Sequence, residues 1–151
     1  PMALGHVPLA AVIADLVADF ESHSPGRHIR LAADGLAERY GDSIDITVYR
    51  CVQEAVTNAL RHGDAENITI ELVADRGTGR LSLVIEDDGA GMPPETVPGF
   101  GLIGIEERIG ALGGSWRIRS ATPRGTRVEI SIPATAEAGG RPIATKEAAT
   151  T

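Results

Sequence analysis

The sequence predicts an α+β fold, a two-layer α/β sandwich in which a mixed, mostly antiparallel sheet is covered on one face by helices. Three segments repeat apolar residues every three or four positions, which is the spacing of an amphipathic helix. Other short segments alternate apolar and polar residues around tight turns, which is typical of antiparallel hairpins. Helices with one apolar stripe must bury it, and the apolar face of a sheet provides the partner.

The first two helices are predicted from their apolar stripes. Residues 8–21 form the first, and the Ser-Pro-Gly triplet at 24–26 should end it. Residues 45–62 form the second, and Gly63 directly after them is a typical helix-ending residue. Between them, residues 28–32 are expected to form a short strand. The two stripes consist of Leu9, Val12, Ile13, Leu16, Val17 and Phe20, and of Val48, Val52, Ala55, Val56, Ala59 and Leu60.

A hairpin, a third helix and two further strands are predicted from the second half of the chain. Residues 68–72 and 81–85 alternate apolar and polar side chains on either side of a Gly-containing turn at 76–79. A helical stripe follows over residues 102–112. The last two strands are expected at 116–118 and 128–132.

Length and composition indicate a single globular domain. The chain has 151 residues, 42% of them hydrophobic, which is enough for one core, and we expect the domain to span residues 25–133. Residues 134–151 are rich in Ala, Thr and Gly and show no periodicity, so we expect a flexible C-terminal tail. The one cysteine, Cys51, allows no internal disulfide and favours a reducing, cytoplasmic compartment.

Charge and residue counts exclude several classes of protein. The chain carries 21 acidic and 14 basic residues, a formal charge of −7, which disfavours a nucleic-acid partner. Its one lysine, Lys146, lies in the expected tail, so neither a P-loop nor a protein-kinase-type lysine site can be assembled. No apolar stretch approaches the roughly 18 residues of a membrane span, so no direct membrane contact is expected.

Four polar side chains share one edge of the second predicted helix: Glu54, Asn58, Arg61 and His62. An Asn carbonyl suits Mg²⁺, which usually takes one or two protein ligands and completes its shell with phosphate and water. Arg61 offers a forked donor for phosphate oxygens. These residue types fit a nucleotide–metal site, and a solvated helix face is the alternative.

The run Asp-Asp-Gly-Ala-Gly at 87–91 follows the second strand of the predicted hairpin. Its glycines would let a flat ligand approach the backbone closely. A carboxylate at this position can accept a hydrogen bond from an exocyclic amine such as adenine N6. A hairpin turn, which favours Asp-Gly for its own reasons, is the alternative.

Gly99, Gly101 and Gly104 match the dinucleotide fingerprint by letters only. That motif must follow a strand directly and precede an acidic residue about 20 positions later, and residues 121–125 contain no acid. What remains is a Gly-rich start of a helix whose first amides can bind phosphate. A plain loop before a helix is the alternative.

The polar stripe of the second helix, the Asp-Asp-Gly-Ala-Gly run and the Gly-rich helix start follow one another along the chain. In this order they resemble the ATP-binding module shared by gyrase, heat-shock chaperone ATPases, mismatch-repair ATPases and histidine kinases. Residues 53–62, Gln-Glu-Ala-Val-Thr-Asn-Ala-Leu-Arg-His, are similar to the N box of sensor histidine kinases. Residues 101–108, Gly-Leu-Ile-Gly-Ile-Glu-Glu-Arg, resemble the nitrate-sensor-like branch, whose partner regulators carry LuxR-type helix-turn-helix domains. The resemblance covers about residues 27–133 and implies a Bergerat-type ATP-binding fold with ATP and Mg²⁺ as ligands.

The resemblance also implies a role for each matched residue. Asp87 would hold the adenine amine, and Gly89 and Gly91 would give the ring room. Asn58 would coordinate Mg²⁺, with Glu54 one turn earlier in or near the metal shell, and these two are the expected catalytic residues. The other assignments are Arg61 facing the phosphates, His62 against the adenine or ribose, Gly99, Gly101, Leu102 and Gly104 on the phosphate side, and Thr126 lining the adenine pocket.

The reaction implied is transfer of the γ-phosphoryl group of ATP to a histidine, and then to an aspartate of a response regulator. In the family, that histidine lies in a separate dimerisation domain and directly precedes an acidic residue, unlike His6, His23 and His28. We therefore expect residues 1–24 to be a linker or the end of a dimerisation helix, in a fragment that binds ATP without phosphorylating itself. Its partners would be its own dimerisation domain, as a homodimer in a full-length protein that can be membrane-anchored, and a LuxR-type response regulator.

Two alternatives stay open at this point. One is a serine kinase of the same fold that acts as an anti-sigma factor, and the other is a non-catalytic nucleotide-binding interaction module. The sequence of residues 101–108 and the short predicted lid at 92–98 favour the histidine kinase. A pure interaction module would not need Glu54, Asn58 and Asp87.

Overall fold

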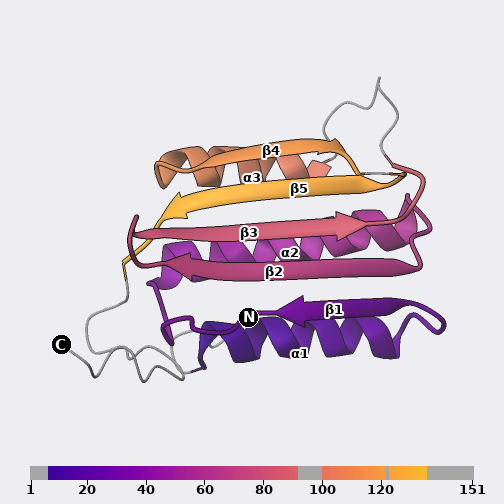
Figure 1. Cartoon of the computed structure of the whole chain (residues 1–151), viewed down its shortest axis with the longest axis horizontal. Coiled ribbons are helices and arrows are strands. Elements are labelled where there is room, and N and C mark those ends of the chain that lie inside the picture. Colours follow the sequence, from indigo (N-terminus) through magenta and orange to yellow (C-terminus); the bar gives the residue numbers. More distant parts are fainter. Residues whose placement is uncertain (1–6, 92–99, 122, 136–151) are drawn as a thin grey trace.

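The computed structural model describes residues 7–91, 100–121 and 123–135, and within them three helices accompany one five-stranded sheet (Figure 1). The helices are α1 (Leu9–Ser22), α2 (Asp42–Arg61) and α3 (Phe100–Ala111). The strands are β1 (His28–Ala32), β2 (Asn67–Asp75), β3 (Arg80–Asp87), β4 (Ser115–Ser120) and β5 (Thr126–Pro133).

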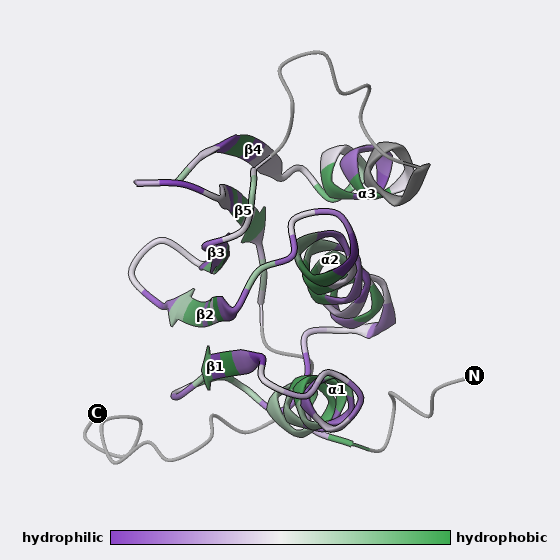
Figure 2. Ribbon diagram, turned by 90° about the vertical axis from the view of Figure 1, so that its right-hand side faces the viewer, coloured by the Kyte–Doolittle hydropathy of each residue, from purple (hydrophilic) through white to green (hydrophobic). Residues whose placement is uncertain are grey.

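The sheet has the strand order β1-β2-β3-β5-β4. Strand β1 pairs in parallel with β2, and the other three pairs are antiparallel. Figure 2 shows all three helices on one side of the sheet, with α1 beside β1, α2 over the centre and α3 beside β4. The two-layer fold with a mixed, mostly antiparallel sheet, predicted from the sequence, is confirmed.

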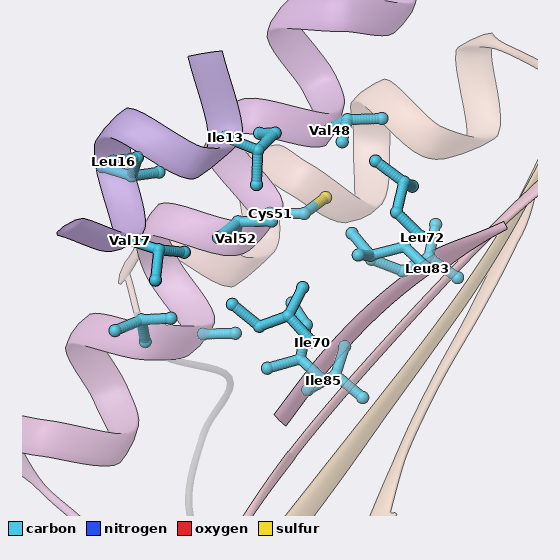
Figure 3. Packing of buried hydrophobic residues seen from close by; sticks show 14 of the residues in the cluster. Ile13, Leu16, Val17, Val48, Cys51, Val52, Ile70, Leu72, Leu83 and Ile85 are labelled. Carbon is cyan, nitrogen blue, oxygen red and sulfur yellow. The ribbon is translucent and has the colours of Figure 1, made fainter. Parts of the chain in front are cut away.

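The hydrophobic core lies between the two layers. Alternate side chains of each strand point to opposite faces, so the apolar residues of β2 and β3 face the helices together (Figure 3). Burying each such side chain contributes roughly 1.5–3 kcal/mol. The core residues of the central strands and of α2 include Ile68, Ile70, Leu72, Leu81, Leu83, Ile85, Val48, Val52 and Val56, all 2% exposed or less.

Helix α1 packs into the same core as the sheet. Leu9 and Ile13 are almost completely buried, and Leu16 and Val17 lie beside α2 in Figure 3. The expectation that residues 1–24 are a linker or the end of a dimerisation helix stays a prediction. The expected tail at 134–151 falls outside the described residues from position 136 onward.

Helix α2 begins three residues earlier than the periodicity of the sequence predicts. Gly41 before it has a φ of 101°, and Asp42 and Asp45 place acidic side chains in the first turn, where the helix dipole favours them. The buried Asp45 side chain also accepts a hydrogen bond from the Tyr40 N–H through Oδ1, at 3.1 Å. Polar contacts thus accompany the start of the helix, ahead of its apolar stripe.

The topology brings the segments with candidate functional residues to one end of the molecule. Figure 1 shows the end of α2, the start of β2, the end of β3 and the β4–β5 turn together on the right of the view. Helix α3 also begins on this side. Among the described residues, no helix is both long enough and apolar enough to cross a membrane.

Candidate functional site

Asp87, the last residue of β3, is half-buried on the face of the sheet that the helices cover. Its Oδ1 accepts a hydrogen bond from the Gly89 N–H at 2.8 Å. Burial raises the pKa of this carboxyl, although hydrogen bonds from the backbone of Gly89 and Thr126 act in the opposite direction. Among the described residues no cation pairs with Asp87, so its carboxylate remains available as an acceptor for a neutral donor.

Asp88, the next residue, has a different set of partners. Its Oδ1 accepts the backbone N–H groups of Glu66 and Asn67, each at 2.9 Å, and its Oδ2 accepts the Asn67 side-chain amide at 2.8 Å. The hydrogen bonds from Asn67 are the main reason that the pKa of Asp88 lies below its usual value. Asp88 thus ties the end of β3 to the start of β2 and is a structural residue.

Two glycines allow three loops to meet beside Asp87. A Cβ on Gly89 would lie 2.5 Å from the carbonyl oxygen of Gly63, in the segment after α2. A Cβ on Gly125, in the β4–β5 turn, would lie 1.8 Å from the carbonyl oxygen of Asp87. Gly125 also has a φ of 107°, which side-chain-bearing residues rarely adopt. The backbone beside Asp87 is therefore packed too closely for any side chain at these two positions.

A hollow of about 170 Å³ opens beside Thr126, the first residue of β5. It is smaller than the roughly 300 Å³ at which small-molecule pockets begin, so this hollow alone would not enclose a nucleotide. A larger hollow of about 430 Å³ lies around the β4–β5 outer face, beside Ser82, Val84 and Arg117. It includes none of the candidate residues, so size alone does not locate the site. The smaller hollow is lined by Ile118, Arg119, Ser120, Gly125 and Thr126.

The polar stripe of α2 lies where the sequence predicts it. Glu54 and Asn58 are half-buried and one helical turn apart, whereas Arg61 and His62 at the end of the helix are exposed. The main-chain carbonyl of Asn58 accepts a hydrogen bond from the Gly63 N–H at 3.1 Å, and Gly63 in turn contacts the loop after β3. The stripe is thus connected through the backbone to the neighbourhood of Asp87.

The expected phosphate side is only partly described. Gly101 and Leu102 lie in the first turn of α3, and Gly104 follows in the same helix, where a Cβ would meet no described atom within 4 Å outside the backbone of the helix. Gly91 lies on the Asp87 side, where a Cβ would approach the Gly125 carbonyl oxygen at 3.2 Å. Gly99 and residues 92–98, the predicted lid, lie outside the described residues.

The described side chains contain no group of three or more His, Cys, Asp or Glu residues that could hold a metal ion. Glu54 and Asn58 nevertheless supply a carboxylate and an amide oxygen, and two such ligands suit a magnesium ion whose other ligands are phosphate and water. The chemistry of the donor set therefore fits Mg²⁺ bound together with a nucleotide.

Two side chains that shape the site, Asp88 and Arg124, were not predicted from the sequence to do so. The alternation of strand side chains does send Asp87 and Asp88 to opposite sides, which is a usable signal. The Nε of Arg124 donates to the Gly89 carbonyl at 2.9 Å across 35 residues of sequence, and no local pattern reports such a contact.

Comparison with known proteins assigns the chain to a family. The family described as histidine kinase-, DNA gyrase B- and HSP90-like ATPase matches residues 41–136, which is more than half of the sequence. The chain belongs to this family. The match includes the α2 stripe, the loop after β3 and the β4–β5 turn, and it confirms the resemblance seen in the sequence.

The chain is also similar to curated histidine kinases. It is 38% identical over 136 residues to the signal transduction histidine-protein kinase/phosphatase UhpB of Salmonella typhimurium, covering 88% of this chain and 26% of that protein. It is 33% identical over 138 residues to the histidine-protein kinase/phosphatase DegS of Brevibacillus brevis, covering 90% of this chain and 35% of DegS. The chain thus spans about a quarter to a third of the length of these relatives.

Solved structures share the fold at low sequence identity. A histidine kinase domain from the blue-light activated kinase EL346 of Erythrobacter litoralis matches with a TM-score of 0.72 and 20% identity, over 83% of this chain and 65% of that one. The ATP-binding domain of PrrB from Mycobacterium tuberculosis matches with a TM-score of 0.66 and 19% identity, over 85% of this chain and 96% of that one. Both agree with the two-layer arrangement described above.

Proposed function

We propose that this chain is the ATP- and Mg²⁺-binding catalytic domain of a sensor histidine kinase. The observation that carries the proposal is Asp87, a half-buried carboxylate held by backbone N–H groups and paired with no cation among the described residues. Such a carboxylate is well suited to accept a hydrogen bond from the exocyclic amine of adenine. Gly89 and Gly91 place no side chain beside it, and the backbone of Gly63 and Gly125 packs closely against these two positions.

The phosphates are proposed to extend from the adenine site toward α2 and α3. Asn58 and Glu54 would hold Mg²⁺, which neutralises charge on the phosphate oxygens when it is bound. Arg61 would donate to a phosphate, and His62 would lie against the adenine or ribose. The amides at the start of α3 would bind the phosphates from the other side, with Gly99, Gly101, Leu102 and Gly104 in this segment.

The proposed reaction is transfer of the γ-phosphoryl group to a histidine nitrogen on a dimerisation domain that this chain does not include. Phosphoryl transfer depends mainly on positioning and on charge stabilisation, and the residues named above supply both. The second partner proposed is a response regulator with a LuxR-type helix-turn-helix domain. The similarity to UhpB and DegS, both named as histidine-protein kinases, supports this proposal over a serine kinase of the same fold.

Calorimetric titration with ATP tests the proposal. The 151-residue chain should bind ATP in the presence of Mg²⁺ and more weakly when EDTA removes the metal. Asn58→Ala should remove most of the gain in ATP affinity that Mg²⁺ provides, so that the affinity for Mg-ATP falls at least tenfold, because the metal loses its amide ligand. Gln53→Ala is the matched control, since Gln53 lies on the same helix and, within the part of the chain that the structure describes, its side chain accepts from Arg50 alone.

Incubation with γ-labelled ATP tests the absence of self-phosphorylation. The chain alone should gain no acid-labile phosphate, whereas a chain that includes the dimerisation domain should gain it on a histidine. Equal labelling of the chain alone would contradict the assignment, and so would ATP binding that Asn58→Ala leaves intact.

A further inference from the structure

The β4–β5 turn contacts the candidate site through a side chain as well as through Gly125. Arg124 reaches the loop after β3, where its Nε donates to the carbonyl oxygen of Gly89 at 2.9 Å. The partner is thus a main-chain atom of the candidate site. Three arginines of the two strands that this turn joins instead pair with the carboxylate of Glu129, and the third of them also pairs with Glu86: Arg117, Arg119 and Arg127.

The peptide unit between Gly89 and Ala90 is held at both ends. Its carbonyl oxygen accepts from Arg124, and its N–H, that of Ala90, donates to the Gly63 carbonyl oxygen at 2.8 Å. The two groups belong to one conjugated plane, so each hydrogen bond polarises the peptide in the direction that strengthens the other. The plane is therefore fixed between the segment after α2 and the β4–β5 turn.

The same glycine orients Asp87. The Gly89 N–H, in the peptide unit before the one that Arg124 holds, donates to Asp87 Oδ1 at 2.8 Å, and the Thr126 backbone also hydrogen-bonds this carboxyl. The direction of the carboxylate therefore depends in part on this N–H, which is joined to the held carbonyl through the Gly89 Cα. Glycine has the widest choice of backbone conformations, and external hydrogen bonds must select one of them. Gly89 cannot be replaced by a stiffer residue, because a Cβ there would lie 2.5 Å from the Gly63 carbonyl oxygen.

We propose that Arg124 is a positioning residue of the nucleotide site: it holds the Gly89 carbonyl and thereby fixes the N–H that directs the Asp87 carboxylate toward adenine. This inference rests on the proposed function, in which Asp87 accepts from the adenine amine. Arg124 acts through Gly89 and contacts neither the base nor the phosphates. A lysine at this position would hold the carbonyl less well, because its ammonium lies on a more flexible stem than the planar guanidinium.

The test is Arg124→Met in the full 151-residue chain, which keeps an aliphatic stem and removes the donor. The Kd for Mg-ATP should rise about threefold to tenfold, the equivalent of one net hydrogen bond. The pKa of Asp87, measured by NMR titration of its carboxyl carbon, should rise above the wild-type value, since the Gly89 hydrogen bond lowers it. Arg124→Lys should fall between wild type and Arg124→Met in both measurements.

Arg76→Met is the matched control, because Arg76 is an exposed arginine in the β2–β3 turn, at the other end of the sheet. It should leave both the Kd and the Asp87 pKa unchanged. If wild type fails to bind Mg-ATP, the proposed function itself is wrong. If wild type binds and Arg124→Met binds equally well, or binds less well with an unchanged Asp87 pKa, only the positioning role is overturned.

Discussion

The two sides of the end of β3 show how neighbouring carboxylates acquire different tasks. On the helix-covered side, Asp87 is half-buried and burial raises its pKa. On the β2 side, Asp88 accepts three hydrogen bonds from Glu66 and Asn67, and its pKa is lowered. The first arrangement leaves a carboxylate for a ligand, and the second uses a carboxylate to join two strands.

This difference teaches that a site residue is recognised by what its environment leaves unsatisfied. Both residues are aspartates in one Asp-Asp-Gly run, and the sequence alone offers only the alternation of the strand to separate them. Stability should therefore depend on Asp88 and on the glycines that bring the loops together, whereas nucleotide affinity should depend on Asp87.

The largest expected effect on stability comes from Gly125→Ala. The new Cβ would lie 1.8 Å from the Asp87 carbonyl oxygen, at a φ of 107°. Overpacking and backbone strain together should lower the free energy of unfolding in urea by about 3 kcal/mol or more. Gly79→Ala is the control, because it has a positive φ but open space, and should cost about 1 kcal/mol. Equal costs would show that the close approach to Asp87 is not what demands glycine.

A smaller effect is expected from Asp88→Asn. Loss of the charge weakens the hydrogen bonds that Asp88 accepts from Glu66 and Asn67, which should lower the free energy of unfolding at neutral pH. The loss should be only about 1–2 kcal/mol, because water screens this carboxylate. Because the folded-state pKa is lowered, this contribution exists above the unfolded pKa and disappears as pH falls through the folded one. Urea unfolding at several pH values should thus show the two proteins converging in acid.

Asp15→Asn controls for the loss of one negative charge, since Asp15 is exposed on α1. This substitution should leave the free energy of unfolding almost unchanged at every pH. If the difference in free energy of unfolding between wild type and Asp88→Asn stayed constant down to acid pH, the structural role of the Asp88 charge would be wrong. A loss of ATP affinity without a loss of stability would also contradict that role.

Much of the fold could be predicted because apolar periodicity is a local signal. The stripes of 8–21 and 45–62 and the alternation around 76–79 correspond to α1, α2 and the β2–β3 hairpin. The start of α2 could not be placed, because it depends on the polar contact between Tyr40 and Asp45 and not on the stripe.

The site was predictable to the extent that its chemistry is local. Asp87, Asn58 and the glycines follow from residue types at fixed spacings in a sequence that resembles a known family. The contacts between Arg124 and Gly89 and between Gly125 and Asp87 join segments more than 30 residues apart. Such contacts depend on sheet register and loop packing, which no spacing in the sequence encodes.

Calorimetric titration of Asp87→Asn with Mg-ATP tests the central claim most directly. The free energy of binding should weaken by about 1.5–3 kcal/mol, a loss of affinity of roughly 10- to 150-fold, which is the scale of a hydrogen bond to a charged group. The free energy of unfolding should not fall, because burial disfavours the charged form that this variant removes. Unchanged affinity for ATP in a folded Asp87→Asn protein would contradict the assignment of this carboxylate to adenine.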